Sequence, residues 1–560
     1  MLQHRMAHVG PKPGEPLKQT DWDNLGYYLY LPGIFTYHDI KALNWIHPID
    51  SQYHMIGGQL YQANKVENGN MVSKYLGGVA LMQTPFFFAG DWVANHYHCP
   101  VDGFSPPYQW AVAIAAIFYA LLGLFFLRSF LLLYFKDLNV AISLLLVCLA
   151  TNFLQYVAVD GGMSHAYIFP LYALILWVTK KWHDHPKAIW AAFIGYIIGL
   201  ATICRPTEAV MLFIPLLWNT HAKEAAKAKW AMVKQHRSHI YITIAFGLIG
   251  IAPQLIYWKA VTGSFIYDVG SAWSFLTPHL RVLTGWEKGW FVYTPITIFF
   301  IIGLFFVKDY PFRKSAIWFC ILNIYIITSW ADWRYGGSYS TRALMQSYPI
   351  FALPFTAFIE YIDAKKWRWL FYALGIYLIC VNLFQLEQYS KTILHYYDMN
   401  RKYYTHIYLN AHPTPTDMSL LDDGEVLNSE QGYTRETLFH LASPLAVQFT
   451  GNSKGIITQV LVHTQAGSWI KVDAQIQTHN GFWGGYLDAE LRKGDSVKHI
   501  RVRLNNPISV EGKANEYTFY MQVPEFFQTA NLSVYISRDG DYEGVIEQME
   551  VTLLQQTATK

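Results

Sequence analysis

Long apolar stretches fill the middle of the chain and predict membrane-spanning helices. A helix needs about 20 mostly apolar residues to cross a bilayer. The fourth and fifth stretches meet at Arg205-Pro206, where proline disfavours a continuous helix. They are therefore either two short spans or one long kinked helix. The ten candidate stretches are 109–133, 139–158, 164–180, 187–204, 207–219, 238–258, 291–307, 315–330, 344–361 and 369–387.

The distribution of Lys and Arg predicts the orientation of these spans. Cytoplasmic loops of membrane proteins carry an excess of both residues. The basic connections fall on one side only if 187–219 crosses twice, which favours two short spans and makes that side cytoplasmic. Residues 1–108, the turn at Arg205, the segments 259–290 and 331–343 and the C-terminal region then lie outside. The basic residues are Lys136; Lys180, Lys181 and Lys187; Lys223, Lys227, Lys229, Lys234 and Arg237; Lys308, Arg313 and Lys314; Lys365, Lys366 and Arg368.

Residues 1–108 form the predicted first outside loop. Its apolar segments 27–37 and 75–95 are too short or too broken to span, and fit helices that lie in the membrane interface. The first twenty residues are polar and contain no signal-peptide core. We therefore expect a further spanning helix to precede this sequence.

The pattern changes from about residue 400 onward, where short alternating stretches are separated by turn residues. Such spacing is typical of a β-sandwich. We predict a helical membrane bundle over 109–390 and an all-β sandwich over 400–560, on the outer side. The predicted strands are 447–450, 456–463, 469–477, 500–504, 517–523, 532–536 and 545–553.

Composition agrees with one membrane part and one water-soluble part. Hydrophobic residues make up 53% of the 560 residues and charged residues 14%, yet mean hydropathy is only +0.16. The net charge of +3 is too small to indicate a nucleic-acid partner. The five cysteines show neither metal-type spacing nor a readable disulfide framework.

An acidic pair in the first outside loop is the first candidate for chemistry. Asp21 and Asp23 stand just before an interfacial helix. Either carboxylate can act as a general base on an acceptor hydroxyl or amine. The alternative is that Asp23 or Asn24 caps a helix beginning near Leu25.

Two basic motifs lie at the outer ends of spans. Arg205, in the sequence RPTE, can bind a lipid phosphate, pair with Glu208 or extend to the headgroups. Residues 330–342 (WADWRYGGSYSTR) place two arginines and two tryptophans around a glycine pair, where backbone can approach a ligand closely. The alternative for this segment is a plain interfacial anchor.

Weaker candidates lie in other outside segments. Asp102 precedes Gly103, a pair that most often forms a turn. His165 opens a span from the outside, although a single histidine is usually structural. Segment 281–295 adds Lys288.

Together these motifs resemble those of the GT-C membrane glycosyltransferases. The shared features are an acidic pair before Gly-Tyr-Tyr, an interfacial helical region, Arg-Pro-Thr between spans, and the late Trp-x-x-Trp-x-Tyr-Gly-Gly-Ser-x-x-x-Arg. The chain is most similar to bacterial members of the dolichyl-phosphate-mannose–protein mannosyltransferase family, and similar in architecture to lipid A aminoarabinose transferase. The resemblance covers roughly residues 20–390.

The resemblance implies transfer of a hexosyl or pentosyl group from a polyprenyl-phosphate donor, with inversion, at the outer face of the bacterial inner membrane. The acceptor would be a glycan, a lipid or a protein. The family's catalytic acid matches Asp23, with Asn24 in place of a glutamate and Asp21 as the alternative. No cofactor is required, although a divalent metal at the two aspartates stays open. Arg205, Arg342 and Arg334 are the implied phosphate ligands, and the possible pocket residues are Asp102, His165, Tyr27, Trp333, Tyr335 and Lys288.

A transporter or flippase of lipid-linked glycan, with the β domain as a receptor, is the competing hypothesis. Transporters usually place charges near the membrane midplane and often contain inverted repeats. Here the charged candidates stand at the outer ends of spans and no repeat is visible, which favours a transferase. The β domain either caps the outer face or binds glycan through Trp469, Phe482, Trp483 and Tyr486.

Overall fold

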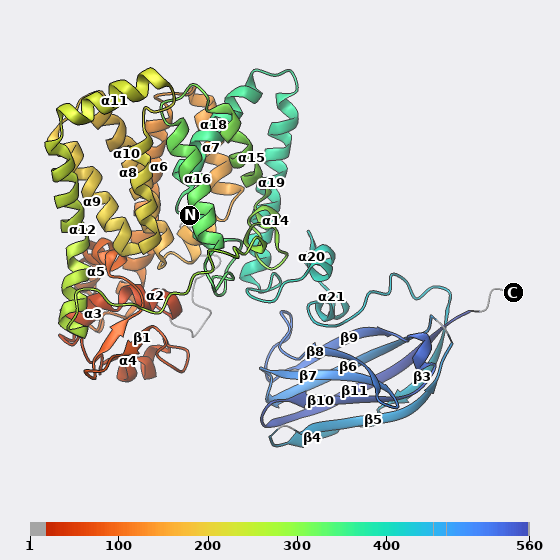
Figure 1. Ribbon diagram of the computed structural model, residues 1–560. Helices are drawn as coiled ribbons and strands as arrows, with labels where there is room; N and C mark the ends of the chain where they lie inside the picture. Colours follow the sequence, from red (N-terminus) through yellow and green to blue (C-terminus); the bar gives the residue numbers. More distant parts are fainter. Residues whose placement is uncertain (1–17, 452, 466, 558–560) are drawn as a thin grey trace. The chain divides into compact units, whose positions relative to one another are not determined.

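The computed structural model describes residues 18–451, 453–465 and 467–557. The chain divides into two compact units, Met1–Leu386 and Glu387–Lys560, which are described separately (Figure 1). Most of the polar N-terminal segment, residues 1–17, lies outside the described residues.

The first unit begins with a small, mainly helical subregion that has its own hydrophobic core. The predicted interfacial segments are helical, and large apolar side chains such as Phe35, Phe88 and Trp92 remain exposed on them. This exposure is consistent with helices that lie against lipid. The elements are α2 (Trp22–Tyr28), α3 (Tyr30–Phe35), α4 (Ile46–Tyr53), β1 (Ala63–Lys65), β2 (Met71–Ser73) and α5 (Gly78–His96).

A bundle of apolar helices follows. It shares one large core of buried aliphatic and aromatic side chains. Its elements are α6 (Pro106–Leu131), α7 (Asp137–Leu149), η1 (Gln155–Val159), α8 (Ser164–Asp184), α9 (Ala188–Cys204), η2 (Pro206–Leu212), α10 (Phe213–Leu217), α11 (Lys223–Gln235), α12 (Ser238–Thr262), α13 (Arg281–Thr284), α14 (Trp290–Tyr293), η3 (Pro295–Thr297), α15 (Ile298–Gly303), η4 (Leu304–Phe306), α16 (Arg313–Thr328), α17 (Arg342–Met345), α18 (Tyr348–Asp363) and α19 (Arg368–Ser390).

Three of the described helices are long and apolar enough to cross a membrane: α6, α12 and α19. The other predicted spans are also helical, but they are shorter, more polar or interrupted. Segment 291–307, for instance, breaks into α14, η3, α15 and η4. The total of about 10 spans therefore stays a prediction, whereas the helical, apolar character of the region is confirmed.

Small residues allow α9 and α12 to approach closely. A Cβ atom on Gly195 would lie 2.0 Å from the carbonyl oxygen of Thr243, and one on Gly199 would lie 2.3 Å from that of Gly247. Such contacts between helix backbones are typical of membrane helix pairs. At the end of α9, Arg205 adopts extended backbone before the 3₁₀ turn of η2, so the predicted break at Arg205-Pro206 is confirmed.

The second unit contains two antiparallel sheets that share one hydrophobic core. The four-stranded sheet has the order β5-β10-β7-β8, and the five-stranded sheet has the order β3-β11-β6-β9, with β4 paired to β11. The predicted β-rich region is therefore confirmed as a sandwich. Its strands are β3 (Tyr433–His440), β4 (Leu445–Phe449), β5 (Lys454–His463), β6 (Trp469–Asn480), β7 (Gly485–Lys493), β8 (Ser496–Arg503), β9 (Ala514–Gln522), β10 (Thr529–Arg538) and β11 (Tyr542–Gln556).

Two of these strands, β3 and β7, are not among the seven predicted. Strand β3 is polar and largely exposed, so it shows no apolar alternation. In β7 the core-facing Leu487, Ala489 and Leu491 do alternate with charged residues, but the central one is only an alanine. Two short helices, α20 (Arg401–Ile407) and α21 (Pro415–Ser419), precede the sandwich. Helix α21 begins with a capping box between Thr414 and Asp417.

Candidate active site

Asp23 lies in the first turn of α2. This helix begins at Trp22, three residues before the expected start near Leu25, and its N-cap residue Asp21 makes no side-chain capping bond. The capping interpretation is therefore wrong. The Asp23 carboxylate is instead available for contacts outside its own helix.

Three donors from distant parts of the chain converge on Asp23. Its Oδ1 accepts hydrogen bonds from the hydroxyls of Tyr61, at 2.9 Å, and Tyr75, at 2.6 Å. Its Oδ2 accepts one from Nη2 of Arg342 at 2.7 Å. Both members of this ion pair are largely removed from solvent, with side-chain exposures of 23% for Asp23 and 10% for Arg342.

The partners of Asp23 keep it ionised. Burial opposes ionisation, but the Arg342 charge and the hydrogen bonds from Tyr75 and Tyr61 outweigh it, so the pKa of Asp23 lies below its ordinary value of 3.8. Asp21 behaves in the opposite way. Burial raises the pKa of Asp21 to about 6, and the nearby Asp160 adds to the rise.

Arg342 is positioned by the loop that precedes it. Within this loop, Gly336 has a positive φ of 63°, a conformation that favours glycine. The buried ammonium group of Lys288 donates to the carbonyl oxygens of Arg334, at 3.1 Å, and Gly336. The hydroxyl of Thr341 adds hydrogen bonds to two further carbonyls. Lys288 is thus a support for the loop.

A pocket of about 410 Å³ opens beside the Asp23–Arg342 pair. Arg205 and Lys74 also line it. Among the described residues, neither side chain has a hydrogen-bond or ion-pair partner, whereas Asp332 adds one exposed carboxylate to the lining. The pocket thus combines one locked carboxylate with two cations that are free to bind an anion. The lining is completed by Tyr27, Tyr75, Met163, His165, Val269, Gly270, Ser271, Ala272, Trp330, Ala331 and Tyr335.

A buried chain of hydrogen bonds connects the pocket to the bundle. Nδ1 of His165 lies 2.5 Å from Oε1 of Gln346, and Nε2 of Gln346 donates to Glu208 at 2.7 Å. The Tyr172 hydroxyl donates to the other carboxylate oxygen of Glu208 at 2.5 Å. Glu208 has no salt bridge with Arg205, so the guanidinium group stays available to the pocket.

The remaining predicted residues divide into two groups. Tyr27 and Tyr335 line the pocket, and the Tyr27 hydroxyl donates to Ser164 at 3.2 Å. Asp102 does not line it. Its carboxylate accepts from the backbone N–H groups of Phe104 and Ser105 and from the hydroxyl of Tyr53, so it holds a turn.

Arg334 and Trp333 stand together outside the pocket lining. The Arg334 guanidinium carbon lies 5.1 Å from the centre of the Trp333 ring, and that of Arg281 lies 4.7 Å from the same ring. Stacked arginines of this kind fit an interfacial cluster.

Several residues of the site carry no sequence signal of their own. Tyr61 and Tyr75 are two of 39 tyrosines, and Lys74 stands at the edge of an apolar stretch. The only feature of the sequence that could have pointed to Lys74 is that a positive side chain is expected close to the acidic pair Asp21 and Asp23. Among the described residues, no group of three or more His, Cys, Asp or Glu side chains is arranged to hold a metal ion.

Comparisons with known proteins found no matching family model and no matching curated protein. Sixteen chains of solved structures match. One is ArnT from Cupriavidus metallidurans bound to undecaprenyl phosphate, at 14% identity and a TM-score of 0.36, over 60% of this chain and 64% of that chain. Another is arabinosyltransferase EmbB from Mycobacterium smegmatis, at 10% identity and a TM-score of 0.29, over 80% and 57%.

A third similar structure is the VP2 subviral particle of infectious bursal disease virus, at 14% identity and a TM-score of 0.18, over 22% of this chain and 32% of that chain. The chain thus spans less than two thirds of the length of each of these three structures.

Proposed function

We propose that this protein is a membrane glycosyltransferase that moves a sugar from a polyprenyl-phosphate donor to an acceptor at the outer face of the membrane. The single observation that carries the proposal is the composition of the pocket. A carboxylate held in its ionised form shares the pocket with Arg205 and Lys74, two cations that have no hydrogen-bond or ion-pair partner in the described part of the chain. The order of the motifs along the chain, which resembles GT-C enzymes, supports the same function.

The charges suit a reaction in which a phosphate leaves. Attack of an acceptor hydroxyl on the anomeric carbon forms one C–O bond and breaks the C–O bond to the phosphate, which takes the electron pair. Arg205 and Lys74 stabilise the developing phosphate charge, an effect that often supplies the largest catalytic term. Arg342 also lines the pocket, so it adds positive charge there while it holds Asp23 in place.

Asp23 takes the proton of the acceptor hydroxyl in this scheme. Its lowered pKa makes it a weak base in the ground state. The acceptor hydroxyl becomes acidic only as its oxygen forms the new bond to the anomeric carbon. Proton transfer to Asp23 therefore occurs late in the displacement. A single displacement of this type inverts the anomeric carbon. Because the phosphate is already activated as a leaving group, the scheme needs no nucleotide and no obligatory metal.

Asp23→Asn tests the function. Purified protein would be given polyprenyl phosphates that carry mannose, galactose or arabinose, with a lipid extract and a glycan extract as acceptors. We expect the variant to lose transfer by about 10³-fold or more while it still binds the donor that the wild type uses. Asp102→Asn, a replacement in the same outside loop but away from the pocket, should keep full transfer.

Two results would contradict the proposal. Undiminished transfer by Asp23→Asn would rule out Asp23 as the base. Movement of intact donor between leaflets by the wild type, without release of polyprenyl phosphate, would indicate a transporter instead.

A further inference from the structure

A second hollow, of about 610 Å³, lies on the outer face of the four-stranded sheet of the sandwich. It is lined by three basic and two aromatic side chains and by one carboxylate. These residues come from β5, β7, β8, β10, the loop between β6 and β7 and the turn after β10, so a rigid sheet positions most of them. They are Lys454, Arg501, Arg538, Trp483, Tyr486 and Asp539.

The loop between β6 and β7 presents an indole to solvent. Gly481 and Gly484 have φ values of 91° and 79°, which only glycine adopts without strain. Between them, Phe482 is buried and anchors the loop, whereas Trp483 is 60% exposed. An exposed Trp on an anchored turn is a typical surface for stacking a flat or ring-shaped ligand.

A buried carboxylate orients the central cation of the hollow. Asp488 is fully buried although it points to the outer face of the sheet, and it accepts from Nε2 of His499 at 2.6 Å and from Ser537 at 2.5 Å. Nε of Arg501 donates to the same carboxylate at 3.1 Å. Burying a charge costs free energy, and a sheet surface that faces solvent does not require a buried charge. Its effect here is to fix Arg501.

Arg501 keeps capacity for a ligand in this arrangement. Its guanidinium group lies 4.5 Å from the centre of the Tyr486 ring, and its Nη2 donates to Ser537 at 3.3 Å. Within the described part of the chain, its Nη1 has no hydrogen-bond partner. Lys454 stands nearby with a half-exposed side chain, at 2.9 Å from the Tyr535 hydroxyl and 3.7 Å from Glu490.

We propose that this hollow binds an acidic carbohydrate, with the sugar ring stacked on Trp483 and its carboxylate or phosphate paired with Arg501, Arg538 and Lys454. The lining itself holds three cations and one exposed carboxylate, Asp539. The two carboxylates just outside it are already paired, Asp488 with Arg501 and Glu490 with Lys454 and Arg492, so the cluster keeps a small excess of positive charge that favours a negatively charged ligand. Arginine presents parallel N–H groups that match a carboxylate or phosphate. This inference does not rest on the proposed transferase activity.

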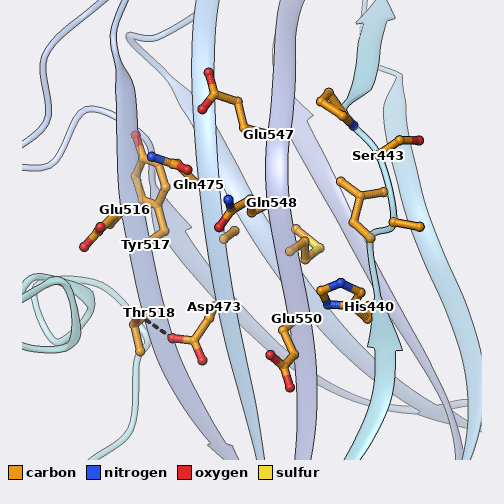
Figure 2. Close-up of a pocket in the computed structure, with 15 residues that line it drawn as sticks. His440, Ser443, Asp473, Gln475, Glu516, Tyr517, Thr518, Glu547, Gln548 and Glu550 are labelled. Atoms are coloured by element: carbon orange, nitrogen blue, oxygen red, sulfur yellow. Dashed lines mark hydrogen bonds between the residues drawn. The ribbon is translucent and has the colours of Figure 1, made fainter.

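The other sheet of the sandwich provides an internal contrast. A groove on its face is rich in carboxylates, as Figure 2 shows for Asp473, Glu516, Glu547 and Glu550. Thr518 donates to Asp473 at 2.7 Å, and no lysine or arginine lines this groove. Since like charges repel, an acidic sugar is expected at the basic hollow and not here.

Binding of hexagalacturonate and of its methyl ester to the full-length protein in lipid nanodiscs tests the proposal. The two probes share their rings and differ in charge. We expect the acid to bind at least roughly tenfold more tightly than the ester, and its affinity to fall as NaCl rises from about 50 to 300 mM. Trp483→Ala and Arg501→Gln should each weaken binding of the acid about tenfold or more.

Matched variants guard against indirect effects. Because Arg501 also holds the buried Asp488, its loss can destabilise the sandwich. Lys454→Gln and Arg538→Gln leave Asp488 untouched and should also weaken binding. Phe526→Ala removes an exposed aromatic outside the hollow, and Glu516→Gln removes a charge from the acidic groove. Both should leave binding unchanged.

Three results would overturn the proposal. Equal affinity for the acid and its ester would exclude a charge-selective site. Full binding by the Trp483→Ala, Lys454→Gln and Arg538→Gln variants would place the ligand elsewhere. Displacement of the acid by inorganic phosphate at equal concentration would show a simple anion site with no role for the sugar ring.

Discussion

Arg342 donates a hydrogen bond of 2.7 Å to Asp23 across 319 residues of sequence. The pair connects α2, which contains Asp23, to the first residue of α17, and both side chains are mostly buried. It makes the carboxylate of the candidate active site dependent on a cation from a distant segment.

Breaking the pair should destabilise the helical unit. We expect Asp23→Asn and Arg342→Gln each to lower the free energy of unfolding by about 2–3 kcal/mol, because each leaves a buried partner without its counterpart. The double variant should lose less than the sum of the two. Thermal unfolding in detergent measures the stability of all three variants. Strictly additive losses of stability would show that the two residues are not coupled.

The pH dependence of transfer should distinguish the two aspartates. A carboxylate base is active when deprotonated, so activity is present above its pKa and is lost as pH falls through it. The pKa of Asp23 is below 3.8, whereas the pKa of Asp21 is raised to about 6. If Asp23 is the base, the transfer rate stays level from pH 7 to about pH 5. A fall centred near pH 6 in the wild type, together with loss of transfer in Asp21→Asn, would assign the role to Asp21.

Arg205→Gln should weaken donor binding without loss of stability. Its guanidinium group lines the pocket and has no hydrogen-bond or ion-pair partner among the described residues, so its removal breaks neither kind of contact. We expect the donor dissociation constant to rise about 10- to 100-fold, with an unchanged melting temperature. Arg281→Gln, on Trp333 and away from the pocket, is the control. An equal effect of both replacements on donor binding would indicate a general electrostatic contribution only.

Tyr75→Phe should raise the pKa of Asp23. The Tyr75 hydroxyl donates to the carboxylate at 2.6 Å and so favours its charged form. Loss of this bond should shift the acidic limb of the pH–rate profile upward by up to about one unit. Tyr53→Phe removes a hydroxyl that donates to Asp102 at the same distance and serves as the control. An unchanged acidic limb in Tyr75→Phe would mean that Asp23 does not control this limb.

Lys288→Met should affect stability more than donor binding. The ammonium group of Lys288 is buried and donates to the carbonyl oxygens of Arg334 and Gly336. Its replacement removes both hydrogen bonds, at a cost of about 1–3 kcal/mol for each buried acceptor that loses its donor. We expect a lower melting temperature and a donor dissociation constant within about threefold of wild type. Loss of donor binding at a temperature where the variant is fully folded would assign Lys288 to the pocket.

The sequence marked Asp23 and Arg342 as candidate site residues but did not show that they form an ion pair. Charged residues at the membrane boundary are costly, so Asp23, Arg205 and Arg342 stand out in an apolar chain. Their contacts depend on how segments hundreds of residues apart fold together, which periodicity and spacing do not encode. Tyr61 and Tyr75 were missed for the same reason, since a tyrosine in an aromatic-rich chain has no local feature that separates a hydrogen-bond donor from a packing residue.

The same limit applies to the prediction of the β-sandwich from the sequence. Strands with an apolar inner face, such as β6 and β11, were visible as alternation, whereas β7 was missed although Leu487, Ala489 and Leu491 alternate with charged residues. Alternation predicts that Asp488 faces outward. It does not predict that Asp488 is buried there and orients Arg501, because this depends on side chains from neighbouring strands.

The distance along the chain between Asp23 and Arg342 has a consequence for synthesis. At roughly 5–20 residues per second, a ribosome needs about 15–60 s to reach Arg342 after Asp23 has emerged. During that interval the nascent protein holds a carboxylate without its cation and cannot assemble the pocket. Premature termination before Arg342 would therefore yield a product without a complete pocket.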